Sequence, residues 1–557
     1  MKTQLTLYIL LSTPRDRPFP LYFTSRINFL LANPATHADL IPGTIHLVDI
    51  AGETQLEQHD ESQRDIVLVP RPSADPEDPL NWSRKRKLLQ IAMVYVYTLG
   101  VGIPTTLQYS VLADITNDTG ISTGELVTGT GLMFLFLGWA CLIWQPIALT
   151  FGRRGVYILS CLLCVPIMVW TAYSKTGGEW YAHRILLGAF ASPIESLPEI
   201  SVPDIFFAHE RGQWMATYVL FLCGSNFIAP LIAGWFNDAF GWRWTMHLGA
   251  MISAAAAVIL FFGMEESLYF RPTVEGQELD AATVSQSEHP TVTQVSDEKV
   301  GAESNISANN SIMQSASSLP PPRTYIQKLA LFVSKPGRPS NKEMFKMMYR
   351  PLLIMLHFPC TDWSGFLYGI SLSWYNVMNG TASPVLSAAP YNWSAAKVGS
   401  AYVAPIIGGI FSMIWSGVIA DKFAIYLARR NKGVREPEQR LWPLALTALI
   451  TTGGLITWGV GAAYGVHWIC LMFGMELSGE TMVSVTIIRN TLGFAFSYGI
   501  TPWVETQGIR NCFITASMVA LVCTLTFLPM IYFGKRLRKF SKDMYWQYVS
   551  TSAFGGH

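Results

Sequence analysis

The sequence predicts an all-α membrane protein in which two bundles of six helices follow each other along the chain. The first reason is composition, because 50% of the 557 residues are hydrophobic and only 14% are charged, with a mean hydropathy of +0.29. Soluble domains carry about 25% charged residues. The second reason is the spacing of long apolar runs, which fall into two groups separated by a polar stretch.

Each group consists of runs that are long enough to cross a membrane, which takes about 20 mostly apolar residues. The first group lies at residues 88–109, 126–149, 155–173, 180–203, 214–235 and 242–263. The second group lies at residues 351–374, 396–419, 441–463, 482–503 and 511–533. The chain therefore has nominally twelve spans, of which one in the second bundle is truncated.

The truncated span is the tenth. Val466–Met475 holds ten mainly apolar residues, which make only about 15 Å of helix, whereas the hydrocarbon core is about 30 Å thick. Glu476 and Glu480 follow at once, so the run cannot simply be extended. An internal loss of some tens of residues, by deletion or by a wrong splice in the gene model, explains this pattern. A naturally shortened re-entrant helix is the alternative.

Polar stretches divide the chain into five parts. The middle of the central stretch, Ala281–Ser318, is rich in Ser, Thr, Asn and Gln and poor in aromatic residues, which is typical of disordered linkers. We expect a mostly disordered cytoplasmic N-terminal tail (1–87), an N-terminal six-helix bundle (88–270), a largely disordered cytoplasmic linker (271–350), a C-terminal helical bundle (351–535) and a cytoplasmic C-terminal tail (536–557). The apolar piece Leu5–Leu11 lacks a convincing cleavage site, so we expect no cleaved signal peptide.

Lysine and arginine residues in alternate loops predict the orientation of the spans. They lie at residues 84–87, 153–154, 211, 422–440 and 535–539. The alternate loops 110–125 and 376–394 carry almost no positive charge. Both termini should therefore be cytoplasmic, which requires an even number of crossings and makes Val466–Met475 part of a tenth span. Three Asn-x-Ser/Thr sequons fall in the predicted outer loops, at Asn117, Asn379 and Asn392, and are candidate glycosylation sites.

Three charged residues lie inside the predicted fourth span: Arg184, Glu195 and Glu199. A charge at mid-bilayer costs at least about 2.5–3.5 kcal/mol, so it usually faces a cavity and serves function. The two glutamates are four residues apart and share one helix face, and a carboxyl group in a low-dielectric site is suited to taking up and releasing a proton. Two alternatives stay open: Glu199 near the inner surface would merely pair with a loop arginine, and Arg184 would be a structural hydrogen-bond hub.

Other polar residues are candidates for contact with a proton or a substrate. Asp362 follows Pro359 in the predicted seventh span, and Gln108, Asn226 and Asn376 are amides in apolar runs. Aromatic residues of the same runs are candidates for lining an apolar site, namely Trp374, Tyr375, Tyr402, Phe494 and Tyr498.

No enzyme signature is present, so we expect neither catalysis nor a cofactor. The sequence has no G-x-x-x-x-G-K-S/T loop for ATP, no His/Cys/Asp cluster with metal-ligand spacing and no G-x-S-x-G elbow. The eight cysteines lie in or beside apolar runs and are expected to be packing residues. The net charge of +1 gives no reason to expect nucleic acid as a partner.

Two loops at equivalent places in the two halves carry partial copies of one motif. Gly152-Arg153-Arg154 joins spans 2 and 3, and Gly417-Val418-Ile419-Ala420-Asp421-Lys422 joins spans 8 and 9. Both resemble the G-x-L-A-D-R-x-G-R-R signature of the major facilitator superfamily, although Leu149 stands where that signature has the aspartate. The resemblance implies a gating role, in which the loop charges meet neighbouring helix ends differently in two transport states.

Further motifs resemble the fungal drug:proton antiporter branch of that superfamily. Ser225-x-x-x-Ala229-Pro230-x-x-Ala233-Gly234 in span 5 resembles its antiporter signature, with Ser and Ala replacing three glycines. The other stretches are Asp78-Pro79-Leu80-Asn81-Trp82-Ser83, Arg184-x-x-x-Gly188, His209-Glu210-Arg211-Gly212, Gly241-Trp242-Arg243-Trp244 and Ile488-Arg489-Asn490-Thr491-Leu492-Gly493-Phe494. The resemblance covers roughly residues 66–545.

The resemblance implies the major facilitator fold and a proton-coupled secondary transporter that exports a small organic compound by alternating access. The compound would be a drug or a toxic or specialised metabolite. A polyamine or cation carrier, or an uptake permease of the same fold, is one alternative, and a transport-like nutrient sensor or a non-transporting remnant is another. The expected partners are a small-molecule substrate, protons and membrane lipid. We expect a monomeric multi-pass protein of the plasma membrane, with the vacuolar membrane as the alternative.

Overall fold

The computed structural model describes most of the two predicted bundles. The described residues are 45–46, 75, 77–269, 327, 329–331, 338–413, 415, 419, 423, 426–427, 430, 434–435, 437–477 and 486–545. They belong to one compact unit, Ile45–His557. Most of the predicted N-terminal tail and linker, and the last twelve residues of the C-terminal tail, lie outside the described residues.

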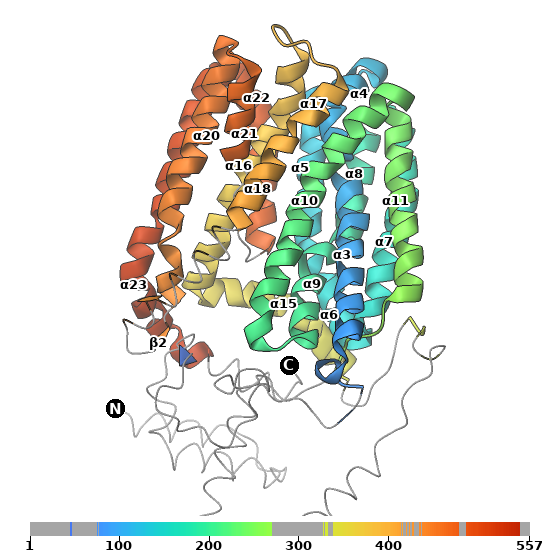
Figure 1. The fold of residues 1–557 in the computed structure, drawn as a ribbon, viewed down its shortest axis with the longest axis vertical. Helices are drawn as coiled ribbons and strands as arrows, with labels where there is room; N and C mark the ends of the chain where they lie inside the picture. The colour runs from blue at the N-terminus through green and yellow to red at the C-terminus, as the bar shows by residue number, and fades with distance from the viewer. Residues whose placement is uncertain are drawn as a thin grey trace, which may run out of the picture. The chain divides into compact units, whose positions relative to one another are not determined.

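The first half forms the six predicted spans, several of them as pairs of helices joined end to end (Figure 1). After η1 (Pro79–Asn81), the spans are α3 (Arg84–Thr106) with η2 (Leu107–Ser110), α5 (Thr123–Trp139) with α6 (Cys141–Phe151), α7 (Arg153–Ala172), α8 (Gly177–Ala191) with α9 (Pro193–Ile205), α10 (Ala208–Phe240) and α11 (Trp242–Gly263). The short helix α4 (Leu112–Thr119) connects the first two spans.

Local sequence explains where these helices begin and end. Gly152 has φ of +113° between α6 and α7, and Gly241 has φ of +86° between α10 and α11. Side chains with a Cβ atom rarely adopt this conformation, so glycine permits both sharp turns. At the start of α5, Ser122 and Glu125 form a reciprocal capping box, which satisfies two backbone N–H groups at the helix N-terminus.

The second half contains the remaining helices and one strand of a minimal pair, whose other strand lies near the N-terminus. The helices are α15 (Asn341–His357), α16 (Pro359–Ser387), α17 (Ala395–Ala401), α18 (Val403–Met413), η4 (Pro437–Leu441), α20 (Leu444–Tyr464), α21 (Trp468–Leu477), α22 (Thr486–Leu525) and α23 (Phe527–Phe540). Gly508, with φ of +75° and ψ of 157°, divides α22 into two arms that correspond to the last two predicted runs. The strands β1 (Ile45–His46) and β2 (Val434–Arg435) pair antiparallel.

The seventh span lies further along the chain than predicted. The prediction placed it at residues 351–374, but the helix is interrupted at Phe358 and the long helix α16 runs from Pro359 to Ser387. Proline lacks a backbone N–H and disfavours helical backbone at the preceding residue, so it starts a new helix here. The apolar residues 351–357 belong instead to the separate helix α15, which begins inside the predicted linker.

The tenth span is as short as the sequence predicts. Helix α21 has ten residues, Trp468–Leu477, and packs against α20 and α18. At Gly474 an added Cβ would lie 3.0 Å from the carbonyl oxygen of Gly454, so the two helices are in close contact. Residues 478–485, which follow, lie outside the described residues.

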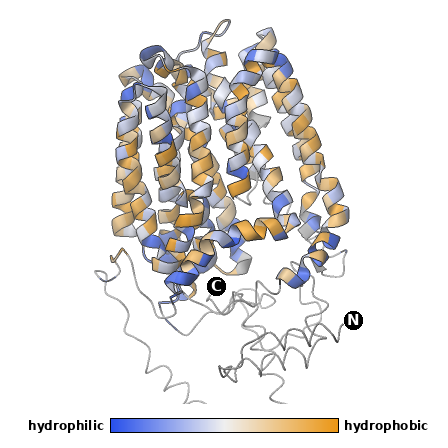
Figure 2. Cartoon of the chain, turned by 180° about the vertical axis from the view of Figure 1, so that it is seen from behind, coloured by the Kyte–Doolittle hydropathy of each residue, from blue (hydrophilic) through white to orange (hydrophobic). Residues whose placement is uncertain are grey.

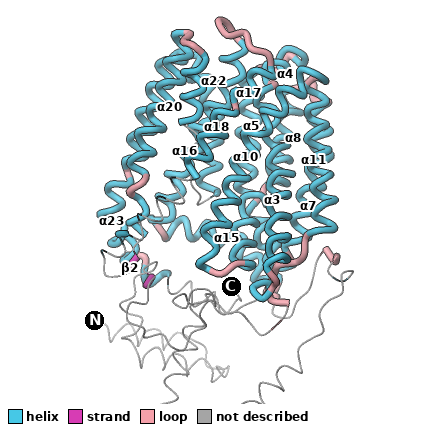
Figure 3. Tube along the Cα trace, viewed as in Figure 1, coloured by secondary structure: helices cyan, strands magenta, loops and turns pink. Residues whose placement is uncertain are grey.

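Hydrophobic residues are distributed along most of the length of the helices, as Figure 2 shows. Among the described residues, nine helical segments are long and apolar enough to cross a membrane. Large apolar side chains point outward from them, for example Phe411 (65% exposed), Leu449 (67%) and Val522 (66%). In water such a surface would be strongly unfavourable, whereas lipid tails are equally apolar. Together with the nearly all-helical fold (Figure 3), this makes the chain a multi-pass membrane protein.

The predicted orientation leads to a labelling experiment. In Figure 1, α6, α9, α15 and α23 mark the lower end of the helices, and α4 and α17 the upper end. The basic loops predict that the lower end is cytoplasmic. Single cysteines placed within residues 422–440, in a background lacking exposed Cys470, should react with an impermeant maleimide only after intact cells are permeabilised. A cysteine at exposed Lys397, on α17, should react without permeabilisation. The reverse result would refute the orientation.

Candidate functional site

A buried ion pair joins the two halves of the protein. Glu195 of α9 and Arg489 of α22 form a very short ion pair between Oε1 and Nη2, and their side chains are only 10% and 4% exposed. One partner comes from the fourth span and the other from the eleventh. A buried ion pair must offset the cost of removing both charges from water, and removing one partner alone is strongly destabilising.

Arg489 also contacts a third helix, α16. Its Nη1 donates to the hydroxyl of Tyr368 on α16 at 2.6 Å, and its guanidinium carbon lies 4.9 Å from the centre of the Tyr368 ring. Its Nε donates to Oδ1 of Asn490 at 3.2 Å. The arginine therefore stays hydrogen-bonded to α16 and α22 when its contact with Glu195 is lost.

The local structure of α9 places its two carboxylates on one face. Pro193 is the first residue of α9 and lacks a backbone N–H, so the helical hydrogen bonding of the span is interrupted just before Glu195. Glu199 lies one turn further along, half-buried, and makes no ion pair with another residue of the described chain. The predicted acidic pair is thus present, but only Glu195 is neutralised by a basic partner.

A second buried charge lies on α8 and lacks an acidic partner among the described residues. Arg184 is 0% exposed; its Nη1 donates to Oε1 of Gln108 on η2 at 3.2 Å, and its guanidinium stacks 4.4 Å from the ring centre of Trp180. Its Nε and Nη2, and Nε2 of Gln108, have no hydrogen-bond partner. Buried polar groups are normally satisfied, so such a group of free donors marks a place for water or for a polar ligand.

Helix α16, which packs against η2, carries further buried polar groups. The side chains of Asn376, Asn379 and Ser383 are at most 3% exposed, and each has a polar atom without a hydrogen-bond partner. The hydroxyl of Tyr402 is likewise unpaired and buried. The spacing of the three α16 residues, at three and four positions, places them on one helix face.

The other predicted site residues are not joined to these clusters. Asp362 is half-buried near the start of α16, and its Oδ1 has no partner. Asn226 is half-buried on α10; its backbone oxygen, rather than its amide, accepts a hydrogen bond from Tyr375 at 3.4 Å. Among the candidate aromatic residues, Trp374 and Tyr402 are buried, whereas Tyr498 is 61% exposed.

Sequence reasoning did not assign a role to Arg489 or Tyr368. The signal for Arg489 was present, because it is a charged residue inside an apolar run, which is the same reason that singled out Glu195. Tyr368 carries no comparable signal, since tyrosine is common in spanning helices and at membrane interfaces.

The first predicted gating loop is held by charges at the lower ends of three helices. Glu266 accepts hydrogen bonds from the backbone nitrogens of Arg153 (3.0 Å) and Arg154 (3.1 Å), at the positive N-terminus of α7. The Arg154 guanidinium donates to the carbonyls of Phe261 (2.6 Å) and Met264 (2.8 Å), at the negative C-terminus of α11. Arg153 pairs closely with Asp204 of α9. The contacts therefore tie α7 to both α9 and α11.

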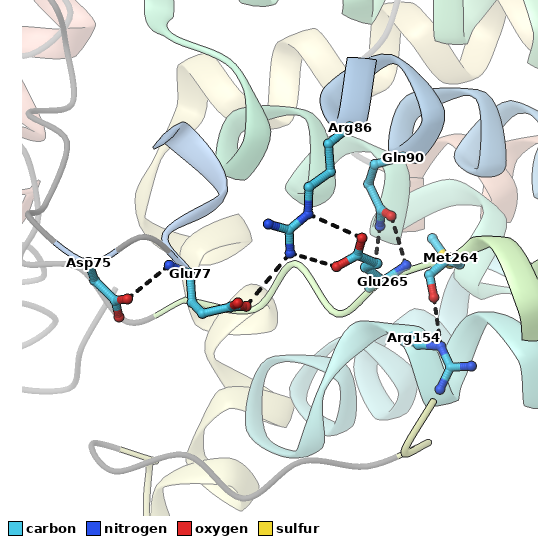
Figure 4. A network of polar contacts seen from close by, with 7 residues as sticks. All are labelled: Asp75, Glu77, Arg86, Gln90, Arg154, Met264 and Glu265. Atoms are coloured by element: carbon cyan, nitrogen blue, oxygen red, sulfur yellow. Dashed lines mark hydrogen bonds and ion pairs between the residues drawn. The ribbon is translucent and has the colours of Figure 1, made fainter. Parts of the chain in front are cut away.

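A neighbouring network ties α3 to the same helix end (Figure 4). Arg86 donates to both carboxylate oxygens of Glu265, at 3.1 and 2.6 Å, and lies 3.6 Å from Glu77. Gln90 exchanges two hydrogen bonds with the Glu265 backbone, at 2.8 and 2.9 Å. The lower ends of α3, α7, α9 and α11 are thus fastened together. The second predicted gating loop, with Gly417, Asp421 and Lys422, lies outside the described residues.

The antiporter-like motif lies at a contact between the two halves. Ala229 and Pro230 are buried on α10, and a Cβ atom added at Gly234 would collide with the carbonyl oxygen of Ala395 on α17. Trp235 Nε1 donates to Ser400 Oγ at 3.1 Å in the same contact. Small residues here let α10 and α17 approach each other at backbone distance, as in other tightly packed membrane helices.

Gly234→Ala should therefore weaken the contact between α10 and α17. Overpacking costs about 1–3 kcal/mol, which would weaken this contact by about fivefold to more than a hundredfold. The expected result is faster labelling of a cysteine placed at Ser400. The matched control is Gly453→Ala on α20, where an added Cβ meets no atom within 4 Å. Equal labelling rates for the two variants would contradict the role assigned to Gly234.

The three sequons differ in accessibility. Asn117 is exposed on α4, and Asn392 is exposed in the connection between α16 and α17. Asn379 was predicted in an outer loop, but it lies inside α16 and is 1% exposed, because the seventh span continues to Ser387. That prediction was wrong, and a glycan at Asn379 is incompatible with this burial.

Two helical halves with a buried ion pair between them, fastened helix ends and unpaired polar groups in the interior define a helical membrane transporter. A profile of the Major Facilitator Superfamily matches residues 94–490. The chain belongs to this superfamily, as the loop motifs and the arrangement of the spans predicted.

Similar proteins are fungal transporters. An uncharacterized MFS-type transporter of Schizosaccharomyces pombe is 27% identical over 568 residues, covering 93% of this chain and 96% of the relative. Protein HOL1 of Saccharomyces cerevisiae is 27% identical over 581 residues, covering 92% and 98%. The MFS antiporter QDR3 of Candida albicans is 30% identical over 210 residues, covering 38% of this chain and 30% of the relative.

Proposed function

We propose that the protein is a proton-coupled antiporter that exports a small organic compound by alternating access. The observation that carries this proposal is the buried pair of Glu195 and Arg489 between the two halves. A proton taken up by Glu195 would remove its charge and with it the attraction to Arg489. Because the two residues belong to different halves, the protonation state of one carboxyl group then biases how firmly the halves are held together.

A second glutamate, Glu199, supports a role of the Glu195–Arg489 pair in proton coupling. Glu199 lies on the same face of α9, half-buried, and has a negative neighbour in Glu195. Two carboxylates that share a low-dielectric site resist being ionised together, which favours proton uptake by one of them. Proton uptake at this pair from one side and release to the other would supply the driving force for export.

The unpaired polar groups support a substrate that forms hydrogen bonds. Arg184 and Gln108 offer donors from the first half, and Asn376 offers both donor and acceptor from the second. Buried Trp374 and Tyr402 provide apolar surface nearby on the second half. A few polar groups in an apolar setting are typical of sites for small organic molecules. The similarity to a protein named as an antiporter supports coupled exchange.

The alternative function of the same fold is uptake, or transport of polyamines and cations. The specific observation in its favour is Glu199, a half-buried carboxylate without a basic partner in the described chain. Asp362, with an unpaired carboxylate oxygen, would add a second negative group. A cationic substrate would neutralise these charges on binding.

Flux measurements separate these functions. The protein encoded by the transcript, with any residues that this transcript adds between Met475 and Ser478, is reconstituted into proteoliposomes. A pH gradient is imposed, and the movement of neutral organic compounds, drugs and polyamines is measured in both directions. For a proton-coupled antiporter we expect an organic compound to move in the direction opposite to the protons. This transport should also dissipate the imposed pH gradient. Flux of polyamines alone would favour the cation carrier. A nutrient sensor or a non-transporting remnant would move none of them.

We further propose that the protein acts as a monomer in the plasma membrane and carries glycans at Asn117 and Asn392. Both asparagines are exposed, and the predicted orientation places them outside the cell. Treatment of plasma-membrane fractions with an endoglycosidase should shift the mobility of the protein, and replacing both asparagines by glutamine should remove the shift. A shift that persists in the double variant would contradict this assignment.

A further inference from the structure

We propose that α15 is a membrane-surface helix that binds the anionic lipid of the inner leaflet. This helix (Asn341–His357) lies between the two bundles in sequence and was not recognised as an element of its own from the sequence. It packs against α6 and α16 at the lower end of the bundle and lies across the spanning helices rather than along them (Figure 1).

One face of α15 is apolar and uncovered. Phe345 is 61% exposed, Tyr349 49% and Leu356 79%. With half-buried Leu352 between them, their spacing of four, three and four residues aligns them in one stripe along the helix. Burying such side chains away from water is worth roughly 25 cal/mol per Å² of apolar surface, so the stripe favours an apolar environment.

The neighbouring face of α15 is basic. Lys342, Lys346 and Arg350 follow at intervals of four residues and form a row beside the apolar stripe. Lys342 and Lys346 are exposed. Long basic side chains extend to phosphate groups while their helix rests on apolar lipid. The combination of an apolar stripe with a flanking basic row is typical of helices that lie in the membrane interface.

The third face of α15 holds the helix against the protein. Met344 is buried, and Arg338 just before the helix stacks 4.3 Å from the ring centre of Phe151 on α6. Ser340 and Glu343 form a capping box at the first turn. The helix is therefore positioned by contacts that use neither the apolar stripe nor the exposed lysines, and both remain available for a partner.

A lipid surface is the partner that fits both the apolar stripe and the basic row of α15. Because α6 is part of a spanning segment, an element packed against its lower end lies at the level of the lipid headgroups. The apolar stripe fits the acyl-chain side of the membrane interface, and the basic row complements anionic headgroups. The cytoplasmic leaflet is the anionic one, and the predicted orientation places the lower end of the helices there.

Hydrogen–deuterium exchange of the full-length protein in nanodiscs tests the proposal. Nanodiscs of phosphatidylcholine are compared with nanodiscs that also contain phosphatidylserine. We expect slower amide exchange in residues 341–357 when phosphatidylserine is present. Since each basic side chain near the surface contributes about fivefold in binding, Lys342→Glu/Lys346→Glu should reduce this lipid-dependent protection by about 25-fold or more.

The matched control is Arg84→Glu/Lys85→Glu, which reverses two exposed basic residues at the start of α3. This variant should leave the lipid-dependent protection of residues 341–357 unchanged. Unchanged exchange in the spanning helices of both variants will show that each is folded. Identical exchange of residues 341–357 in the two kinds of nanodisc would overturn the proposal.

Photo-crosslinking identifies what covers the apolar stripe. A photo-reactive amino acid placed at position 345 should crosslink to phospholipid in nanodiscs. The same amino acid at buried position 344 should crosslink to peptides of α6 instead. Crosslinks from position 345 to peptides of this chain between residues 270 and 337, or to a second copy, would show that a protein segment covers the stripe and would refute the lipid assignment.

Discussion

Glu195→Gln should abolish proton-driven transport while the protein still reaches the membrane. Glutamine is close in shape to glutamate, but it neither exchanges a proton in this pH range nor carries the charge that pairs with Arg489. The dependence of flux on an imposed pH gradient should disappear in proteoliposomes. A variant whose flux still follows the gradient would remove Glu195 from the mechanism.

Glu195→Gln should also destabilise the protein. This loss of stability has to be distinguished from the loss of proton coupling. Arg489 would remain buried without its carboxylate partner, and breaking a buried pair in this way costs about 3–5 kcal/mol. The double variant Glu195→Gln/Arg489→Gln removes both charges and should recover part of the thermal stability. Its flux should remain independent of the pH gradient, because the proton-binding group is still missing.

A second buried ion pair provides the control. Glu438 of η4 and Arg538 of α23 lie 2.6 Å apart and are 10% and 12% exposed. Both belong to the second half, so this pair does not connect the two halves. Glu438→Gln should lower the melting temperature of the protein and leave the gradient dependence of the remaining flux intact. Equal loss of coupling in Glu438→Gln and Glu195→Gln would mean that destabilisation explains both results.

The short tenth span leads to the second prediction with a large effect. Helix α21 is only ten residues long, about half the length needed to cross the membrane. We expect the messenger RNA to encode extra residues between Met475 and Ser478. A protein containing them should transport, whereas the 557-residue chain, whose second bundle lacks one wall, should transport weakly or not at all. Transcript sequencing and flux measurements on both proteins provide the test.

The alignment with one relative contains gaps on the side of this chain. The alignment with the Schizosaccharomyces pombe transporter is 568 residues long, more than the whole of this chain, although it includes only 93% of it. That relative therefore contains residues that have no counterpart here. A message that matches this chain without insertion, together with normal transport by its product, would instead support a naturally shortened, re-entrant span.

The spans of the first half could be predicted from sequence because their signals are local. Each apolar run is long enough to cross the bilayer, and the breaks between runs coincide with residues such as Gly152 and Gly241, whose positive φ only glycine adopts readily. The position of the seventh span could not be read in the same way. Residues 351–357 are as apolar as a span, and hydropathy does not distinguish an interfacial helix from a crossing one.

The candidate functional site was also predicted only in part from the sequence. A glutamate inside an apolar run is recognisable from sequence, since its insertion cost demands a reason. Which residue neutralises it is not recognisable, because Arg489 lies in the other half of the chain and only the fold brings its side chain to Glu195 on α9. Arg184 and Gln108, in contrast, were both selected from sequence, but their mutual contact and their unpaired donors depend on the fold.

The sequence by itself determined the membrane class, the six-plus-six plan, the superfamily and the short tenth span, because apolar length and loop motifs act over neighbouring residues. The tertiary structure alone decided which charges meet, that Asn379 is buried, and that α15 presents an apolar stripe beside its lysines. Those properties depend on which helix faces are covered by other helices, and coverage is set by contacts between residues far apart in the chain.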